Sequence, residues 1–594
     1  MALSRLELRL FLFKDHVREL NLRHTMPFPD PPLPLTFKQV MENRPVAAES
    51  STFIHFPDEL KASILQYLVK DEEALAKLAT FNSDCRQLAR SCQFNCLSLR
   101  FDLRSYTIVY VLGKEIIERL TTCERRPRRP SFGACIRHLR VDCRLYLPTE
   151  HGESRDDSFI RNMLEALDEE REPGKDDMFK KPPKHWLPDM LGAIPSLPHL
   201  KSLSLLNGPL CDNLVDALMR SPATHLRLDG IFGKNLSLRP NRDDWPLESL
   251  GINFRVPWQG SEEKLDVSPF WGELLWLCCS TLRFLKLEQH LSARTAQQKY
   301  QPLRFKQRFP KLRTVLLYGG IILSTPALAS LLQSDDLSTL RLQFSGQEES
   351  ARNLLGRPTK RHKLETLVIE WLRPPERRDI GFIKANTGIK SLVLTSPNRL
   401  GLGPFNLFAI RSLTEHTELK LLSLKWGQHG IVLNDILSAL RPPLTSLEVL
   451  HLNVVTFDQP WVLDHEDIAP RLAPLTGLRR LIFEGDCCIT NRGIKFPLGV
   501  ASPHHQNEML KQAQFYVKPF PQLELLHIGE LLITFKKGTD DHRTPVVTGT
   551  TRDEAGSGYG LEKRELGIEG PVSAMDYTRE TLEWNRRLLN GEVW

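Results

Sequence analysis

Apolar residues recur along this chain in one short phrase: an apolar residue, two spacers, an apolar residue, one spacer and a third apolar residue. The phrase is first regular at Leu200, Leu203 and Leu205 and is last regular at Leu478. The copies between them begin at Ala223, Leu247, Leu282, Leu312, Leu337, Leu364, Ile389, Leu419 and Leu447, and outlying copies begin at Ile136 and Leu523. Successive copies lie on average about 28 residues apart, a period typical of solenoid repeats.

We number each phrase from its first apolar residue, so positions 1, 4 and 6 are apolar. Positions 3 to 7 alternate in polarity and predict a short strand with one buried face. Between the phrases we expect helices at 212–220, 269–279, 326–333, 434–440 and 466–472. Ser268 before Pro269 and Thr325 before Pro326 are favoured helix starts. A strand and a helix of this size bury their apolar faces only when copies stack.

Residues 136–529 therefore resemble the leucine-rich-repeat family. The resemblance implies an α/β fold, a curved solenoid with a parallel sheet inside and helices outside. The Asn or Cys that the family places three residues after the last leucine is mostly missing here, so the repeat borders stay open. A generic leucine-rich α/β domain is the alternative.

A second pattern begins at Phe56, where a proline and two acids precede an apolar stripe. Three helices are expected between residues 56 and 89, with an acidic turn at 71–73. The stretch resembles an F-box, matched at Phe56, Pro57, Glu59, Leu60, Ile64, Leu65, Leu68, Leu75, Leu78, Phe81, Arg86, Leu88 and Ala89. Cys85 stands where that family commonly has tryptophan, and the loss of such a large anchor is expected to weaken partner binding.

The F-box resemblance implies a Skp-type adaptor as partner and, through it, a cullin-RING ubiquitin ligase. The implied adaptor-binding residues are Phe56, Pro57, Leu60, Ile64, Leu65, Leu68, Leu75, Leu78, Cys85 and Leu88. The chain itself would be a non-catalytic receptor that places a target protein near the ubiquitin thioester. The alternative is a repeat scaffold whose helices only cap the solenoid.

Five segments organise the chain. We expect a flexible extension at 1–50, the F-box-like helices at 51–95 and the solenoid at 96–529. The phrase is interrupted by an inserted loop near 148–188, and 530–594 reads as a largely disordered tail with a terminal helix at 577–589. The basic run at 125–130 is interpreted as a solvated loop, with a nuclear-import or phosphate-binding patch as the alternative.

Composition narrows the function classes. A formal charge of +7 over 594 residues gives no reason to expect a nucleic-acid partner. The charged residues among 1–23 argue against a secretory leader, and no apolar run approaches the ~18–20 residues of a membrane span. The 11 scattered cysteines suit reduced thiols, so we expect a cytoplasmic or nuclear protein.

No catalytic signature stands out. Glycine fingerprints, H-E-x-x-H and G-x-S-x-G are missing, and the cysteines lack paired zinc spacing. We therefore expect no cofactor and no metal site.

Positions 3, 5 and 7 face solvent on the concave side of the predicted sheet. Aromatic, aliphatic and basic residues mix there, as suits a protein partner. The candidate target-binding residues are Arg227, Lys286, Tyr318, Arg341, Trp371, Lys425, Trp426 and His451. Each aromatic side chain has an equal alternative, packing against the next repeat.

Overall fold

The structure is a computed structural model. It describes residues 37–41, 56–68, 71–100, 103–121, 131–142, 192–194, 197–210, 218–232, 244–255, 268–290, 303–319, 323–344, 363–371, 380–396, 411–427, 433–440, 444–455, 463–484, 486, 489–490, 493–494, 503–528, 531–537 and 543–550. The predicted insertion at 148–188, the basic run at 125–130 and the terminal helix at 577–589 lie outside these residues. The chain divides into two compact units, Met1–Leu312 and Arg313–Trp594, which we take in turn.

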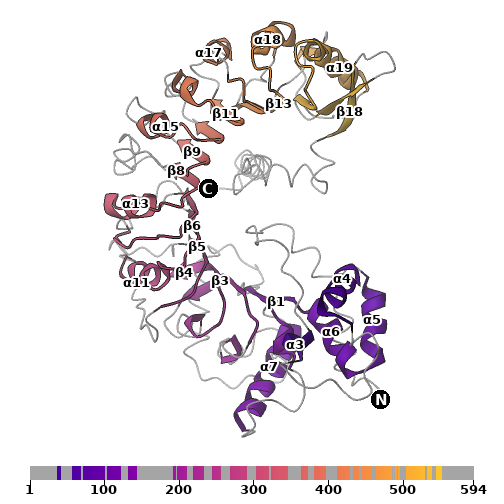
Figure 1. The fold of residues 1–594 in the computed structure, drawn as a ribbon, viewed down its shortest axis with the longest axis vertical. Helices are drawn as coiled ribbons and strands as arrows, with labels where there is room; N and C mark the ends of the chain where they lie inside the picture. Colours follow the sequence, from indigo (N-terminus) through magenta and orange to yellow (C-terminus); the bar gives the residue numbers. More distant parts are fainter. Residues whose placement is uncertain are drawn as a thin grey trace, which may run out of the picture. The chain divides into compact units, whose positions relative to one another are not determined.

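The first unit begins with helices. After α3 (Phe37–Val40), the helices α4 (Asp58–Leu68), α5 (Glu72–Phe81) and α6 (Ser83–Gln93) occupy the stretch for which the sequence predicts three helices (Figure 1). Asp71 caps α5 by accepting from the Ala74 amide at 3.0 Å, and Asn82 caps α6 by accepting from the Cys85 amide at 2.7 Å. These caps satisfy amides that a helix start leaves unpaired, which separates the two helices.

Six strands of the first unit pair in parallel, in chain order, within the described residues. They are β1 (Cys96–Arg100), β2 (His138–Asp142), β3 (Ser202–Leu210), β4 (His225–Phe232), β5 (Ser249–Arg255) and β6 (Phe284–His290). The unit also contains α7 (Leu103–Thr121), the 3-10 turn η2 (Gly133–Cys135) and α11 (Ser268–Cys278). Leucines at position 4, such as Leu203, Leu226 and Leu250, are buried against the elements behind the sheet.

The second unit continues the same pattern with β7 (Thr314–Gly319), β8 (Thr339–Phe344), β9 (Thr366–Trp371), β10 (Ser391–Ser396), β11 (Leu421–Gly427), β12 (Val449–Val455), β13 (Arg480–Glu484) and β16 (Leu525–Ile528), all parallel. Its helices are α13 (Thr325–Leu332), α15 (Gly381–Ala385), α17 (Leu433–Ala439), α18 (His465–Leu472) and α19 (Pro503–Val517), with the 3-10 turn η5 (Ser412–Glu415). Figure 1 shows α13, α15, α17 and α18 on one side of these strands. The predicted helices at 269–279, 326–333, 434–440 and 466–472 are confirmed to within about one residue, the usual scatter of helix ends. The predicted helix at 212–220 lies largely outside the described residues.

One end feature corrects the sequence analysis. The strands β17 (Leu531–Lys537) and β18 (Arg543–Thr550) form an antiparallel hairpin that extends the sheet beyond β16, although the sequence placed them in a disordered tail. Leu531, Leu532 and Ile533 are all buried, so the hairpin is packed against a core. The sequence analysis missed it because its residues do not follow the repeat phrase. A separate pair, β14 (Ile489–Thr490) and β15 (Gly493–Ile494), is also antiparallel.

One backbone contact recurs at the start of many of the parallel strands. The carbonyl of position 2 accepts two amides from the following repeat: Arg137 O from Lys201 N at 2.8 Å and Ser202 N at 3.1 Å, for example. In the second unit, Lys420 O accepts from Glu448 N at 2.8 Å and Val449 N at 2.9 Å. Because the contact uses only main-chain atoms, it fixes the register of successive phrases whatever their side chains.

None of the helices in the described part of the chain is long and apolar enough to cross a membrane.

Candidate binding surfaces

Helix α4 has a buried inner face and an outer face with exposed apolar residues. Its inner face carries Lys61 and Leu65, which are buried, while Leu60 on its outer face is 53% exposed and Tyr67 83% exposed. Ile64 lies between them, half-buried, at helical spacing from both. An outward apolar stripe on a helix whose other side already faces a core is a surface suited to a partner.

The α4 outer face, which we define as Leu60, Ile64 and Tyr67, is not the only exposed apolar surface among these helices. Phe56, just before the helix, is 43% exposed, and Pro57 beside it is exposed as well. Phe81, at the end of α5, is 72% exposed. The sequence analysis named Phe56, Pro57, Leu60 and Ile64 as adaptor-binding; Tyr67 was not among them.

The other residues expected to bind an adaptor lie inside. A core cluster contains Leu65, Leu75, Leu78, Cys85 and Leu88, with Leu68 packed against it. Three short helices supply few apolar residues, and these are used to hold the helices to one another. In this structure these side chains stabilise the helical unit, and their contact with an adaptor stays a prediction.

Helix α6 is joined to the first repeat. Its Gln87 donates from Nε2 to the Ser131 carbonyl at 2.8 Å, and Phe94 packs edge-on against Phe132 at 4.7 Å between ring centroids. Cys135, in η2, shares a small core with Val40 and Phe94. Glu115 of α7 accepts the Phe132 amide at 2.6 Å and the Gly133 amide at 3.1 Å. The helical unit and the start of the repeats therefore share a buried junction.

The solvent face of the strands forms straight rows, because equal phrase positions pair in register. In the first unit, position 5 carries basic residues on alternate strands, namely Arg140, Arg227 and Lys286. Lys286 forms an ion pair with Glu288 at 2.7 Å, and Arg227 is half-buried. In the second unit, position 3 begins with a row of hydroxyls: Thr314, Thr339, Thr366 and Ser391.

The remaining candidate target-binding residues are less accessible than the sequence suggested. Arg341 lies over the Tyr318 ring at 4.6 Å, and both are buried. His451 is buried and hydrogen-bonded through Nδ1 to the Ser423 hydroxyl at 2.8 Å.

Trp426 is also buried, whereas Lys425 beside it is half-buried. Trp371 is the last residue of β9 and pairs in register with Phe344 of β8. The structure describes its backbone but not its side chain. Of the two alternatives left open for the aromatic residues, packing within the chain holds for Tyr318 and Trp426, because neighbouring strands bring large side chains together in one row.

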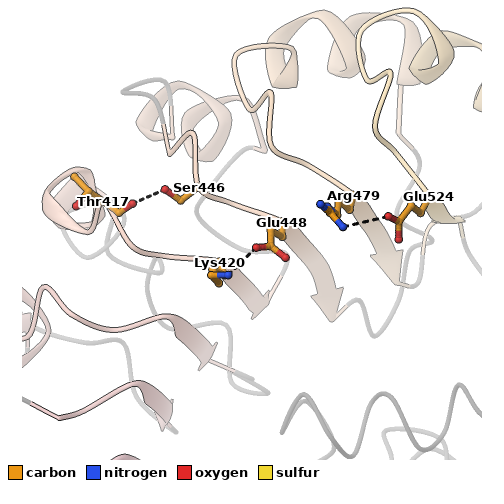
Figure 2. A network of polar contacts seen from close by, with 6 residues as sticks. All are labelled: Thr417, Lys420, Ser446, Glu448, Arg479 and Glu524. Atoms are coloured by element: carbon orange, nitrogen blue, oxygen red, sulfur yellow. Dashed lines mark hydrogen bonds and ion pairs between the residues drawn. The ribbon is translucent and has the colours of Figure 1, made fainter.

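A polar network lines the start of the strands β11 to β16. Figure 2 shows Lys420 paired with Glu448 at 2.9 Å and Arg479 paired with Glu524 at 3.5 Å, each pair joining position 2 of adjacent repeats. The Ser446 hydroxyl donates to the Thr417 carbonyl at 2.6 Å. The charged pairs are exposed, and exposed ion pairs contribute little to stability. We therefore interpret this edge, at the start of the strands, as a solvent-exposed surface.

The sequence analysis missed a buried network in the second unit. His465, the first residue of α18, contacts the Tyr516 hydroxyl through Nδ1 at 2.8 Å and the Asp486 carboxylate through Nε2 at 2.8 Å. Asp486 also accepts the Leu463 amide at 3.1 Å, and burial raises the pKa of Tyr516 well above its usual value. The three residues follow no motif spacing, so only the fold brings them together. Since they are fully buried, they lock α18 to α19.

Within the described residues, no group of three His, Cys, Asp or Glu side chains could hold a metal ion.

Repeated parallel strands, in-register rows and the shared carbonyl at each strand start define a leucine-rich-repeat fold. No protein-family model matches the chain, and no curated protein matches its sequence. Among solved structures, a leucine-rich-repeat protein of Leptospira interrogans, LIC12759, is 14% identical with a TM-score of 0.27, covering 64% of this chain and 88% of that chain. TLR13, in a complex with ssRNA13, is 14% identical with a TM-score of 0.26, covering 58% of this chain and 48% of its own. Both are likenesses at low identity and low TM-score, and the fold is assigned from the strand register instead.

Proposed function

We propose that this chain is the substrate receptor of a Skp-cullin-F-box type ubiquitin ligase. The helices α4 to α6 would bind a Skp-type adaptor, and the solvent face of the strands would hold a target protein. The chain would contribute no catalytic group; it would act by bringing a target lysine near the ubiquitin thioester, because proximity turns a bimolecular step into an effectively unimolecular one.

The observation that carries the adaptor half is the α4 outer face. Leu60 and Tyr67 are exposed on a helix whose opposite side carries the buried Lys61 and Leu65, and Phe56 just before the helix is exposed as well. Burying a leucine of this kind against a partner is worth about 1.5–3 kcal/mol. A partner that covers Phe56, Leu60 and Tyr67 therefore has enough apolar surface for stable capture.

A second function has its own observation. The contacts of Gln87, Glu115 and Phe94 with the 131–135 segment favour a capping role for α6, as expected of a repeat scaffold whose end must be sealed. The two roles use different parts of the helical unit: α6 faces the repeats, whereas the α4 outer face is turned to solvent. The alternative function is therefore a repeat scaffold that binds no adaptor. In that case the α4 outer face binds some other partner.

The test is a pull-down from cells with the full chain, read out as co-purified adaptor and cullin. Leu60→Asp places a charge on the α4 outer face without touching the core, and we expect adaptor binding to weaken about tenfold or more. Ile117→Asp is the matched control, because Ile117 is 60% exposed on α7, outside that face. If both variants recover the same amount of adaptor, or if the unchanged chain recovers none, the adaptor proposal is wrong. The scaffold alternative then remains.

A further inference from the structure

The small net charge of the chain, which gave no reason to expect nucleic acid, conceals a local asymmetry. Between Glu288 and Asp335 the sequence contains no aspartate or glutamate. The structure describes part of this stretch, where four cationic side chains are exposed. We call them the basic row: Arg304, Lys306, Arg308 and Lys311. Within the described residues, none of the four side chains forms an ion pair or a hydrogen bond, so their charge is not neutralised there.

Buried neighbours turn the basic row outward. Leu303, Phe305 and Phe309 are buried, and the two aromatic rings pack edge-on at 6.1 Å between their centroids. Burial alternates with exposure from Leu303 to Lys306, as it does in an extended chain, where residues two apart project to the same side about 6.6 Å from one another. Because the apolar side chains point inward, the cations between them project into solvent.

An exposed aromatic side chain lies beside the basic row. Gln307 donates from Nε2 to the Gly272 carbonyl at 3.4 Å, and a β-carbon at Gly272 would lie 3.6 Å from the Arg304 carbonyl oxygen. Gly272 of α11 therefore faces this segment. Trp276 follows one helical turn later, on the same side of α11, and is 51% exposed. Glu273, the one acid of α11, is also exposed, so the helix adds one negative charge next to four positive ones.

We propose that the basic row and Trp276 bind single-stranded nucleic acid. The four cations can donate charge-assisted hydrogen bonds to successive phosphates of one strand. The Trp276 indole offers a face on which an unpaired base stacks. A cationic track beside an exposed aromatic side chain binds the backbone and the flat faces of bases, so we expect little sequence preference. This inference goes beyond the ligase function and rests on neither the adaptor nor the target protein.

The composition of this surface favours nucleic acid over a protein or a membrane. The centre of a protein interface is depleted in charged residues, whereas interfaces with nucleic acid are strongly positive. Binding at a membrane surface needs several apolar side chains that insert among the lipids. Phe305 and Phe309 are buried, which leaves Trp276 as the exposed aromatic residue of this surface.

The experiment measures the binding of a dye-labelled oligouridine to the full chain by fluorescence anisotropy at several salt concentrations. Four phosphate contacts to a single strand should give a slope of about −2.8 when the logarithm of the association constant is plotted against that of the salt concentration. Lys306→Gln/Arg308→Gln removes two contacts, so the slope should change to about −1.4. Affinity at low salt should weaken about tenfold or more.

Arg471→Gln/Arg479→Gln is the matched control for charge. It lowers the net charge equally, but each arginine is already paired with an acid on the surface of the second unit. We expect its affinity and salt slope to equal those of the unchanged chain.

Trp276→Ala tests the stacking contact separately. Loss of one base stack should weaken binding about fivefold or more. The salt slope should stay the same, because the indole carries no charge. The control Tyr110→Ala, at a tyrosine that is 52% exposed on α7, should bind as the unchanged chain does.

Three results would overturn the proposal: no binding of oligouridine at low salt, equal losses in Lys306→Gln/Arg308→Gln and its charge control, or full affinity in Trp276→Ala. Polyglutamate that binds as tightly as oligouridine through the same cations would make an acidic protein the occupant. Phosphatidylserine vesicles that bind more tightly than oligouridine would make it a membrane, and either result would overturn the proposal as well.

The adaptor pull-down described above separates this inference from the proposed function. Lys306→Gln/Arg308→Gln should recover as much adaptor as the unchanged chain. Failure of oligouridine binding alone would therefore leave the ligase proposal standing.

Discussion

The packing between successive repeats makes a sharp prediction at Gly477, which precedes position 1 of its phrase. A β-carbon added there would lie 2.4 Å from the Thr445 carbonyl oxygen and 3.2 Å from that of Leu447, both backbone atoms of the preceding repeat. In two other repeats, the residue before position 1 donates a hydrogen bond from its hydroxyl to a carbonyl of the preceding repeat. Ser446 donates to Thr417 O at 2.6 Å, and Thr281 donates to Leu247 O at 2.8 Å. At Gly477 the backbones approach too closely for any side chain.

Gly477→Ala should therefore destabilise the second unit. Forcing an extra methyl group into a packed junction costs about 1–3 kcal/mol, and the smaller unfolded-state entropy of alanine returns about 0.4–1 kcal/mol. The net expected loss is about 1–2 kcal/mol in the free energy of unfolding. Because repeats are coupled to their neighbours, the loss weakens the interface on one side of the repeat.

Gly388 provides the matched control, because it also precedes position 1 and nothing lies within 4 Å of a β-carbon placed there. Gly388→Ala should stabilise the chain by about 0.4–1 kcal/mol through the unfolded state alone. Urea unfolding of both variants, followed by circular dichroism, gives the two free-energy changes. Opposite signs support the close approach; a Gly477→Ala variant as stable as Gly388→Ala would refute it.

Two further predictions concern buried polar groups. Tyr516→Phe removes the hydroxyl that contacts Nδ1 of His465, and leaving that nitrogen unpaired should lower the free energy of unfolding in urea by about 1–3 kcal/mol. The control Tyr67→Phe, at an exposed tyrosine, should change that free energy little. Equal effects of the two substitutions would argue against the buried network. His416 is fully buried, and burial lowers its pKa below the usual 6.5 despite the opposing effect of Glu415. Because the unfolded chain then binds the proton more readily, stability should fall as the pH drops below about 6.5, and urea midpoints of His416→Leu should fall less over that range than those of the unchanged chain. Identical pH dependence in the variant would show that other groups control it.

Strand positions were predictable because the phrase encodes burial directly. Leu450 and Leu452 occupy positions 4 and 6 of β12 and point to the core, as alternation requires, and the same reasoning places every regular phrase. Local capping was less certain: α13 is capped by Ser324, one residue earlier than expected, since Thr325 already belongs to the helix. Alternation identifies a face, whereas a cap depends on single backbone angles.

The solvent face shows where sequence reasoning stops. Tyr318 and Lys425 occupy the same phrase position, yet Tyr318 is buried under Arg341 and Lys425 is half-buried, because exposure depends on the neighbouring strand. On α4, Leu60 and Leu65 look alike in the sequence but face opposite sides of the helix. The His465–Asp486 contact joins residues with no local relationship at all. Such pairings are properties of the assembled repeats.

The antiparallel hairpin β17–β18 also has a consequence for behaviour at high concentration. A row of parallel strands presents at its last edge the same unpaired backbone pattern that each internal strand offers to the next, so it is a template for head-to-tail growth with other copies. β17 reverses the strand direction, and Arg543 at the start of β18 donates to the carbonyls of Phe520 and Leu523 while lying over the Phe535 ring. Pro545 in β18 removes one backbone donor from that edge. The hairpin thus ends the parallel row, because the edge of β16 is paired with β17 and is not left as a template for a strand of another copy.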